Sequence, residues 1–254
     1  MPEFEAKRPY QKVGLELRNR LMKQEYRVGE KLPAERDIAQ MLDVSRTLVR
    51  EALIMLELEG LIEVRKGSGV YVINAPQSAL MEDQFTGGDD IGPFEMLQAR
   101  QLLESNIAEF AAMQATPNDI IQMRQAVDRQ IAELAQGEGS QDGDKEFHLS
   151  VARATQNSVL VEMLLESWQR RDQSPMWKQL HARVHNTNYQ HKWLKDHSEI
   201  LMALQRKDPA ASKRAMWQHL ENVKQKLFEL SDVDDPHFDG YLFNSSPVVI
   251  EQKQ

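Results

Sequence analysis

The stretch that decides the fold runs from residue 32 to residue 72 and reads LPAERDIAQMLDVSRTLVREALIMLELEGLIEVRKGSGVYV. Its apolar residues first recur with helical spacing and then alternate, which predicts two short helices followed by a two-stranded hairpin. A helix pair joined by a tight turn and followed by such a hairpin is typical of winged helix-turn-helix readers of duplex DNA.

The junctions within this stretch fit that layout. Pro33 suits a first helical turn, where its missing N–H costs nothing. The connection Asp43-Val44-Ser45 is short, and Ser45 is a good N-cap for the second helix. Gly60 is expected just beyond the end of that helix, where a left-handed backbone is common.

The second helix carries an apolar stripe, and its arginines are expected on another face. Arg46, Thr47 and Arg50 lie near its N-terminal end, which a recognition helix presents to base edges and phosphates. The hairpin tip over residues 65–69 is basic and glycine-rich, so its backbone could approach a phosphate or the minor groove. The alternative is an ordinary helical subdomain with solvated surface arginines.

The motifs PAER, VSRTLVREAL, LELEGL and RKGSGVYV, in this order and at this spacing, resemble the GntR family of bacterial transcription regulators. One departure is Asp43, where many members have glycine, but aspartate tolerates a left-handed backbone better than most residues. The resemblance implies seven DNA-contacting residues: Arg36 for phosphate, Arg46 and Arg50 for guanine edges or nearby phosphates, Ser45 and Thr47 for the DNA backbone, and Lys66 and Gly67 for the minor groove.

Charge is divided unevenly along the 254 residues, which suffice for two modest domains. Residues 1–76 hold 13 Lys+Arg and 12 Asp+Glu, whereas residues 77–254 hold 18 and 27. The first part is therefore net +1 and the second part net −9, which sum to −8, and DNA would repel the second part. We expect that part to be a sensor or dimerisation unit and not a second DNA clamp.

The sequence also restricts the compartment. There is no cysteine, so disulfides and thiolate metal sites are excluded. No apolar stretch is long enough to span a membrane, and the start lacks the pattern of a signal peptide. The bacterial cytoplasm is the expected location.

The predicted fold class is mainly α, with an N-terminal winged helix-turn-helix domain (helices and a small β-hairpin wing) and a C-terminal all-helical bundle. The expected divisions are a flexible start (1–8), the winged domain (9–74), a linker (75–92), an effector-binding and dimerisation domain (93–230) and a tail (231–254). Helices are expected at 9–24, 94–115, 117–135, 142–155, 158–170, 175–185, 188–206 and 209–230.

Three helices of the second domain carry histidine at positions that face a core. Asp144 and His148 are four residues apart and project from one side of a helix, while His197 and His219 lie in or beside apolar stripes. Burying a neutral imidazole without a partner is costly, and a shared Zn, Ni or Mn ion would satisfy all four side chains. Hydrogen-bonded core histidines are the alternative.

Arg100 is a second unusual residue of this domain. It shares a helical face with apolar residues, and Glu104 follows one turn later. A structural ion pair is one interpretation. The other is a guanidinium that grips the carboxylate of a small organic acid.

The segments DKEFHLSVARATQNSVL, WLKDHSEILMAL and AMWQHLENV resemble the FCD effector domain of the FadR subfamily within the GntR family. The resemblance implies Asp144, His148, His197 and His219 as metal ligands and Arg100 as an effector-binding residue. Over nearly the whole chain, the sequence is similar to hexuronate-pathway repressors. That similarity implies a homodimer that binds a palindromic operator and is released by a sugar acid of the uronate type.

Three other functions are considered. A metal-dependent hydrolase would use the histidines to activate water, but no HExxH motif, nucleophile elbow or phosphate-binding glycine loop is present, so we expect no enzyme. In a pure metal sensor, the cation itself would be the signal. The third is a FadR-type regulator of another carboxylate pathway.

Overall fold

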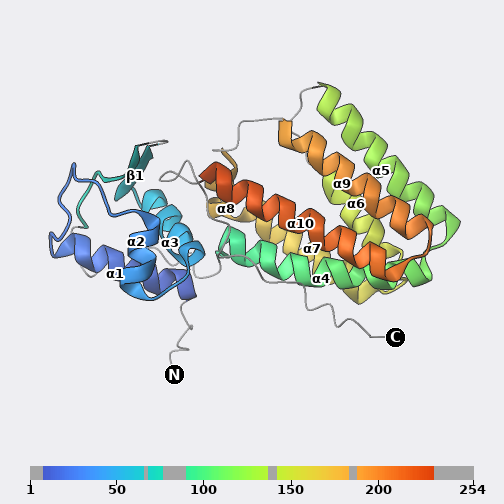
Figure 1. The fold of residues 1–254 in the computed structure, drawn as a ribbon, viewed down its shortest axis with the longest axis horizontal. Helices are drawn as coiled ribbons and strands as arrows, with labels where there is room; N and C mark the ends of the chain where they lie inside the picture. Colours follow the sequence, from blue (N-terminus) through green and yellow to red (C-terminus); the bar gives the residue numbers. More distant parts are fainter. Residues whose placement is uncertain (1–7, 66–67, 77–89, 137–141, 183–187, 232–254) are drawn as a thin grey trace. The chain divides into compact units, whose positions relative to one another are not determined.

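The computed structural model describes residues 8–65, 68–76, 90–136, 142–182 and 188–231. It confirms the predicted fold class: helices dominate, and one two-stranded antiparallel sheet follows the first three of them (Figure 1). Contacts divide the chain into two compact units, with residues 1–94, 174–183 and 229–254 in unit 1 and residues 95–173 and 184–228 in unit 2. In the described ranges, no helix has the length and apolar character needed to cross a membrane.

Unit 1 contains the predicted helix pair and hairpin. Ser45 caps α3 by accepting a hydrogen bond from the Leu48 N–H at 3.3 Å. Asp43 has a φ of 51° in the turn, and Gly60 has a φ of 69° beyond the end of α3, so both residues have the expected left-handed backbone. The elements are α1 (Pro9–Met22), α2 (Glu35–Leu42), α3 (Arg46–Leu58), β1 (Ile62–Arg65) and β2 (Gly69–Val72).

One detail of this region differs from expectation. Helix α2 begins at Glu35, with Ala34 as its N-cap, so Pro33 precedes the helix and is not in its first turn. The extended backbone of Ala34 sets the start of the helix, and its side chain makes no capping hydrogen bond.

The wing contains a third extended segment in addition to the two strands of the hairpin. The two predicted strands form the hairpin, in which Ile62 pairs with Val72 and Val64 with Val70. A preceding segment, residues 29–32, adds backbone hydrogen bonds along the other edge of β2, and Lys31 forms a bridge with Tyr71. The sequence does not predict this third segment, because it is too short to show an alternation of apolar and polar residues.

The core of unit 1 lies between α1 and α3, which pack closely. The Met55 side chain fills the space beside Gly14, where a Cβ atom would lie 2.1 Å from the Met55 methyl carbon and would force that side chain to move. The apolar stripe predicted on α3 is buried at every position: Val49, Ala52, Leu53 and Leu56.

Helix α8 (Pro175–Ala182) belongs to unit 1 although it lies between helices of unit 2 in the sequence. The Ser174 hydroxyl accepts a hydrogen bond from the Trp177 N–H at 3.0 Å and so caps its first turn. The helix packs against α3, where the Gln179 amide donates to Glu57 at 2.9 Å. Unit 1 therefore includes a helix from the second half of the chain.

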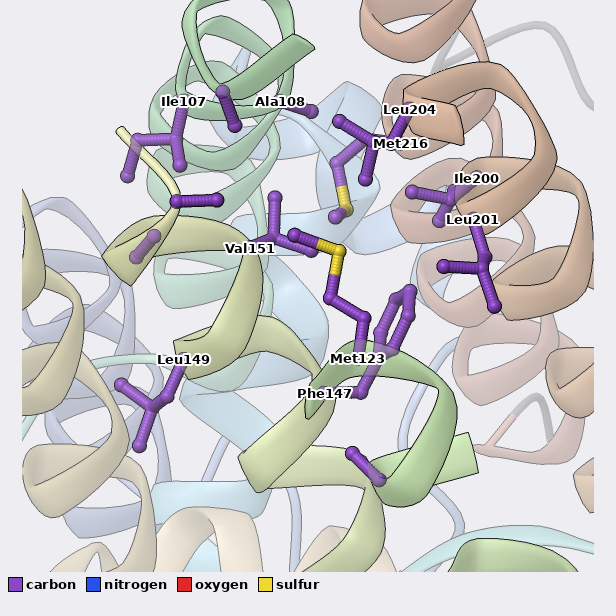
Figure 2. Close-up of a cluster of buried hydrophobic side chains, with 14 of the residues drawn as sticks. Ile107, Ala108, Met123, Phe147, Leu149, Val151, Ile200, Leu201, Leu204 and Met216 are labelled. Carbon is purple, nitrogen blue, oxygen red and sulfur yellow. The ribbon is translucent and has the colours of Figure 1, made fainter. Parts of the chain in front are cut away.

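Unit 2 is an all-helical bundle whose helices lie side by side (Figure 1). Helix α5 packs against α6 and α9, and α6 packs against α7. Figure 2 shows apolar side chains from several of these helices meeting in one core, with Met123 beside Phe147. The helices are α4 (Pro93–Gln114), α5 (Pro117–Gln136), α6 (Asp142–Arg153), α7 (Ser158–Gln173), α9 (Asn188–Gln205) and α10 (Pro209–Ser231).

Candidate functional sites

Unit 2 brings together the four side chains predicted to bind a metal. Asp144 and His148 come from α6, His197 from α9 and His219 from α10, and one potential ligand atom of each lies within 4.8 Å of the others. The His197 Nε2 is 3.2 Å from the His219 Nε2 and 3.5 Å from the Asp144 Oδ1. The three imidazoles are buried, while Asp144 is partly exposed.

Each imidazole also turns its other nitrogen toward an oxygen atom. The Nδ1 of His148 contacts Glu104, that of His197 lies 2.8 Å from Gln130 Oε1, and that of His219 lies 3.4 Å from Asp196. Oxygen partners of this kind fix the tautomer and orient histidines that bind metals.
 The protonation of the cluster favours a cation. Burial lowers the pKa of His197, and the nearby His219, His148 and Arg100 lower it further. Burial also lowers the pKa of His219, so both rings are neutral near pH 7. With the Nδ1 atoms of His197 and His219 directed at Gln130 and Asp196, the Nε2 atoms of these two neutral rings converge with His148 and the Asp144 carboxylate, and this set fits a divalent ion such as Zn, Ni or Mn.

Arg100 is buried beside this cluster, and the expected pair with Glu104 is present. Its Nε donates to Glu104 Oε1 at 2.5 Å, and the other oxygen of Glu104 contacts His148. Burial raises the pKa of Glu104, but Arg100 and His148 outweigh that effect and hold it at about 2. No described residue accepts a hydrogen bond from the terminal nitrogens of Arg100, so the ion pair leaves donors for a ligand.

Two partners of the histidines were missed in the sequence. Asp196 directly precedes His197 in the KDH segment, so its proximity to a candidate ligand was a usable signal. Gln130 carries no such signal, because it lies on α5 and meets His197 only through the packing of α5 against α9.

The candidate DNA-reading residues of unit 1 divide into exposed and buried sets. The Arg36 side chain is 75% exposed, Ser45 is exposed, and Thr47 is half-buried near the start of α3. Lys66 and Gly67, at the tip of the wing, lie outside the described residues. Ser45 and Thr47 lie at the N-terminal end of α3, the end that a recognition helix presents to DNA, whereas Arg36 lies in the first turn of α2.

Arg46 and Arg50 are placed differently from the expected exposed face, since they are only 6% and 1% exposed. The Arg50 Nε donates to both oxygens of Glu35 at 2.9 Å, and its Nη2 contacts the same carboxylate. Glu57, two helical turns after Arg50 on the same flank of α3, accepts the hydrogen bond from α8. Helix α3 therefore has packing partners on the flank that carries Arg50 and Glu57, in addition to those on its apolar stripe.

Comparison with known protein families identifies the family of this chain. Residues 9–72 match the model of bacterial regulatory proteins of the gntR family, and residues 95–222 match that of the FCD domain. The chain belongs to the GntR family of transcription regulators and carries an FCD domain.

Particular relatives are similar over nearly the full length. The Uxu operon transcriptional regulator of Escherichia coli is 56% identical over 246 residues, which cover 96% of each chain. The Uxu operon regulator of Haemophilus influenzae is 54% identical over 96% of this chain and 91% of its own. The Exu regulon transcriptional regulator of Escherichia coli is 49% identical over 96% of this chain and 95% of its own.

Solved structures of lower similarity also align. Streptococcus agalactiae GntR has a TM-score of 0.44 and 26% identity, and the alignment covers 85% of this chain and 99% of that chain. Escherichia coli McbR/YncC has a TM-score of 0.48 and 19% identity, with 88% of this chain and 99% of that chain covered.

Proposed function

We propose that this protein is a ligand-responsive repressor of hexuronate catabolism genes, which binds a palindromic operator as a homodimer and is released by a uronate-type sugar acid. The observation that carries the proposal is the buried Asp/His cluster with Arg100 beside it, in a chain that also has the GntR reader. The names of the relatives, Uxu and Exu regulators, supply the pathway.

The chemistry of the cluster suits a hydroxy or keto acid. A divalent ion held by Asp144, His148, His197 and His219 would leave positions for the carboxylate and an adjacent oxygen of the ligand. Arg100 supplies guanidinium donors next to it, which can bind a carboxylate with two hydrogen bonds. Zinc is the ion we favour for three imidazoles and one carboxylate.

In unit 1, the proposed DNA contacts are Arg36, Ser45 and Thr47, together with Lys66 and Gly67 of the wing. Arg46 and Arg50 reach DNA only if they leave their buried positions. We therefore propose that DNA and α8 compete for the Arg50 flank of α3, and that the arrangement with α8 on α3 is the DNA-released one.

Two connections run from the effector site to α3. Helix α4 carries Arg100 and Glu104, and its second residue, Phe94, donates its N–H to Glu51 of α3 at 2.9 Å. Helix α7 leads through Ser174 into α8, which packs on α3. A ligand that binds the two arrangements unequally would change the affinity for DNA through these connections.

The test uses the full-length protein and labelled DNA from upstream of hexuronate genes. Fluorescence anisotropy should show tight binding that glucuronate, galacturonate or fructuronate weakens at least tenfold, and a chelator should abolish this response. His197→Ala should lose both the metal and the response, whereas His191→Ala on the same helix should retain both. A His197→Ala protein with full metal content and normal release would overturn the ligand set.

The competing functions give different results in the same assay. A pure metal sensor would change its DNA affinity with added Zn alone and ignore the acids. A regulator of another carboxylate pathway would bind its DNA and be released by an acid that is not a uronate.

A further inference from the structure

We propose that Trp168 and Arg171 on α7 form a second subsite for the effector, which binds an additional hydroxyl or carbonyl oxygen of the acid. The inference rests on the proposed function, because it assumes that the carboxylate of the ligand binds at the metal cluster and Arg100. It deepens that function by stating which acids the site selects: acids that carry further oxygen atoms along the chain, and not simple alkyl carboxylates.

The first observation is an unsatisfied donor. Trp168 is fully buried, and its indole Nε1–H has no hydrogen-bond partner among the described residues. A buried donor left without an acceptor is costly, so native proteins supply one, often a water or a ligand. A tryptophan that served packing alone would not need its N–H at this position, because phenylalanine also fills an apolar core.

The second observation is the pair of guanidiniums on the indole ring. The Cζ of Arg100 lies 4.2 Å and that of Arg171 lies 3.9 Å from the ring centroid of Trp168. Arg171 is anchored through Nε and Nη2 to Asp172, at 3.2 and 3.0 Å, which fixes its plane against the ring. Two buried cations that share one indole make this locus attractive to electronegative oxygen.

The third observation places this locus at the metal cluster. The ring of His148 lies 5.7 Å from that of Trp168, measured between centroids. Arg171 interacts electrostatically with both Arg100 and Asp144, and Arg100 interacts with His197. The indole ring and both guanidiniums therefore lie next to His148, one of the four proposed ligands, so one small molecule could contact both halves.

The experiment measures binding of two acids of equal chain length, gluconate and hexanoate, to the zinc-loaded full-length protein by calorimetry. The wild type should bind gluconate at least tenfold more tightly. Trp168→Phe keeps an aromatic ring but removes the N–H, so it should lose about tenfold in gluconate affinity and little in hexanoate affinity. Its zinc content should be unchanged.

The matched control is Trp177→Phe, which removes another buried indole, from α8 in unit 1, and should leave both affinities unchanged. The proposal is overturned if the wild type binds both acids equally, or if Trp168→Phe still prefers gluconate as the wild type does. The last result would mean that water satisfies the indole.

A second measurement avoids dependence on a folded variant. The chain has four tryptophans, so ¹⁵N-tryptophan labelling gives up to four indole N–H resonances. The Trp168 resonance should move downfield with gluconate and stay in place with hexanoate, and a resonance that ignores both acids contradicts the subsite. The proposed function is tested by a different experiment, the anisotropy assay, and it fails if no uronate releases the protein from operator DNA.

Discussion

Both units bury an arginine beside a glutamate, but the two pairs are built differently. In unit 1, Arg50 directs Nε and Nη2 at a single carboxylate, that of Glu35, and the pair ties α3 to α2. In unit 2, Arg100 reaches Glu104 through Nε alone, and Glu104 divides its oxygens between Arg100 and His148. The Arg50–Glu35 pair holds two helices together. The Arg100–Glu104 pair leaves the terminal nitrogens of Arg100 available and connects Arg100 to the candidate metal ligand His148.

This difference shows that burial and pairing do not by themselves assign a role to an arginine. A guanidinium that uses one nitrogen for its partner still has donors with which to recognise a ligand. One that uses two nitrogens must break a buried ion pair before it recognises anything. The contrast gives four predictions, which follow from the largest expected effect to the smallest.

Arg50→Ala is expected to destabilise unit 1 by about 3–5 kcal/mol, because it leaves the buried carboxylate of Glu35 without that partner. Thermal unfolding of the full chain measures the loss, and hydrogen exchange of the α2 and α3 amides should locate it. A change below about 0.5 kcal/mol, as expected for ordinary surface substitutions, would show that the pair is not a structural element.

The double variant Glu35→Gln with Arg50→Met separates structure from DNA recognition and serves as the control for that experiment. Removing both charges should restore most of the stability. If Arg50 also contacts DNA, operator affinity should stay low in this stable protein. Full recovery of DNA affinity would limit Arg50 to the scaffold role.

Glu104→Gln is expected to weaken metal binding by about 10–100-fold, because it removes the charge that orients His148. Competition with a zinc-binding dye measures the affinity. The matched control on the same helix is Glu109→Gln, which removes a partly exposed pair with Lys213 and should leave zinc affinity unchanged. Equal zinc affinity in the Glu104→Gln and wild-type proteins would mean that the Arg100–Glu104 pair, like the Arg50–Glu35 pair, only stabilises the fold.

Gln179→Ala removes the hydrogen bond from α8 to Glu57, worth about 1 kcal/mol. If α8 covers the Arg50 flank, the variant should bind operator DNA about two- to fivefold more tightly without effector. Anisotropy titrations of the full-length protein measure this change. A decrease in affinity would mean that α8 supports the reading conformation of α3 instead of competing with DNA.

Arg36→Ala should have the smallest effect and no effect on stability, because the side chain is exposed and only 3.5 Å from the neighbouring Asp37 carboxylate. As a phosphate contact, it should weaken binding to all DNA sequences similarly. It should also reduce the salt dependence, the slope of log affinity against log salt, by about one. An unchanged slope would remove Arg36 from the interface.

Much of the fold could be predicted because its signals are local. Helix periodicity, the cap at Ser45, the left-handed positions Asp43 and Gly60, and the two-stranded hairpin of the wing are all confirmed within a few residues. The convergence of Asp144, His148, His197 and His219 also agrees with the sequence, because each histidine lies on or beside an apolar stripe that had to face a common core.

The predictions that failed or were missed depend on contacts between distant segments. Arg50 is polar and lies off the apolar stripe, so an exposed position was the natural expectation, yet Glu35, 15 residues away, pairs with it inside unit 1. Gln130 gave no signal, because its partner His197 is 67 residues away in the sequence.

The sequence by itself determined the two kinds of unit, the order of the helices and the set of residues that gather at the cluster, because periodicity and capping act within a few turns of chain. Only the tertiary structure decided that α8 packs on α3 and that one arginine is locked by its glutamate while the other retains free donors. The reason is physical: the partner of a buried charge is chosen by the packing of whole helices, and no local pattern encodes that choice.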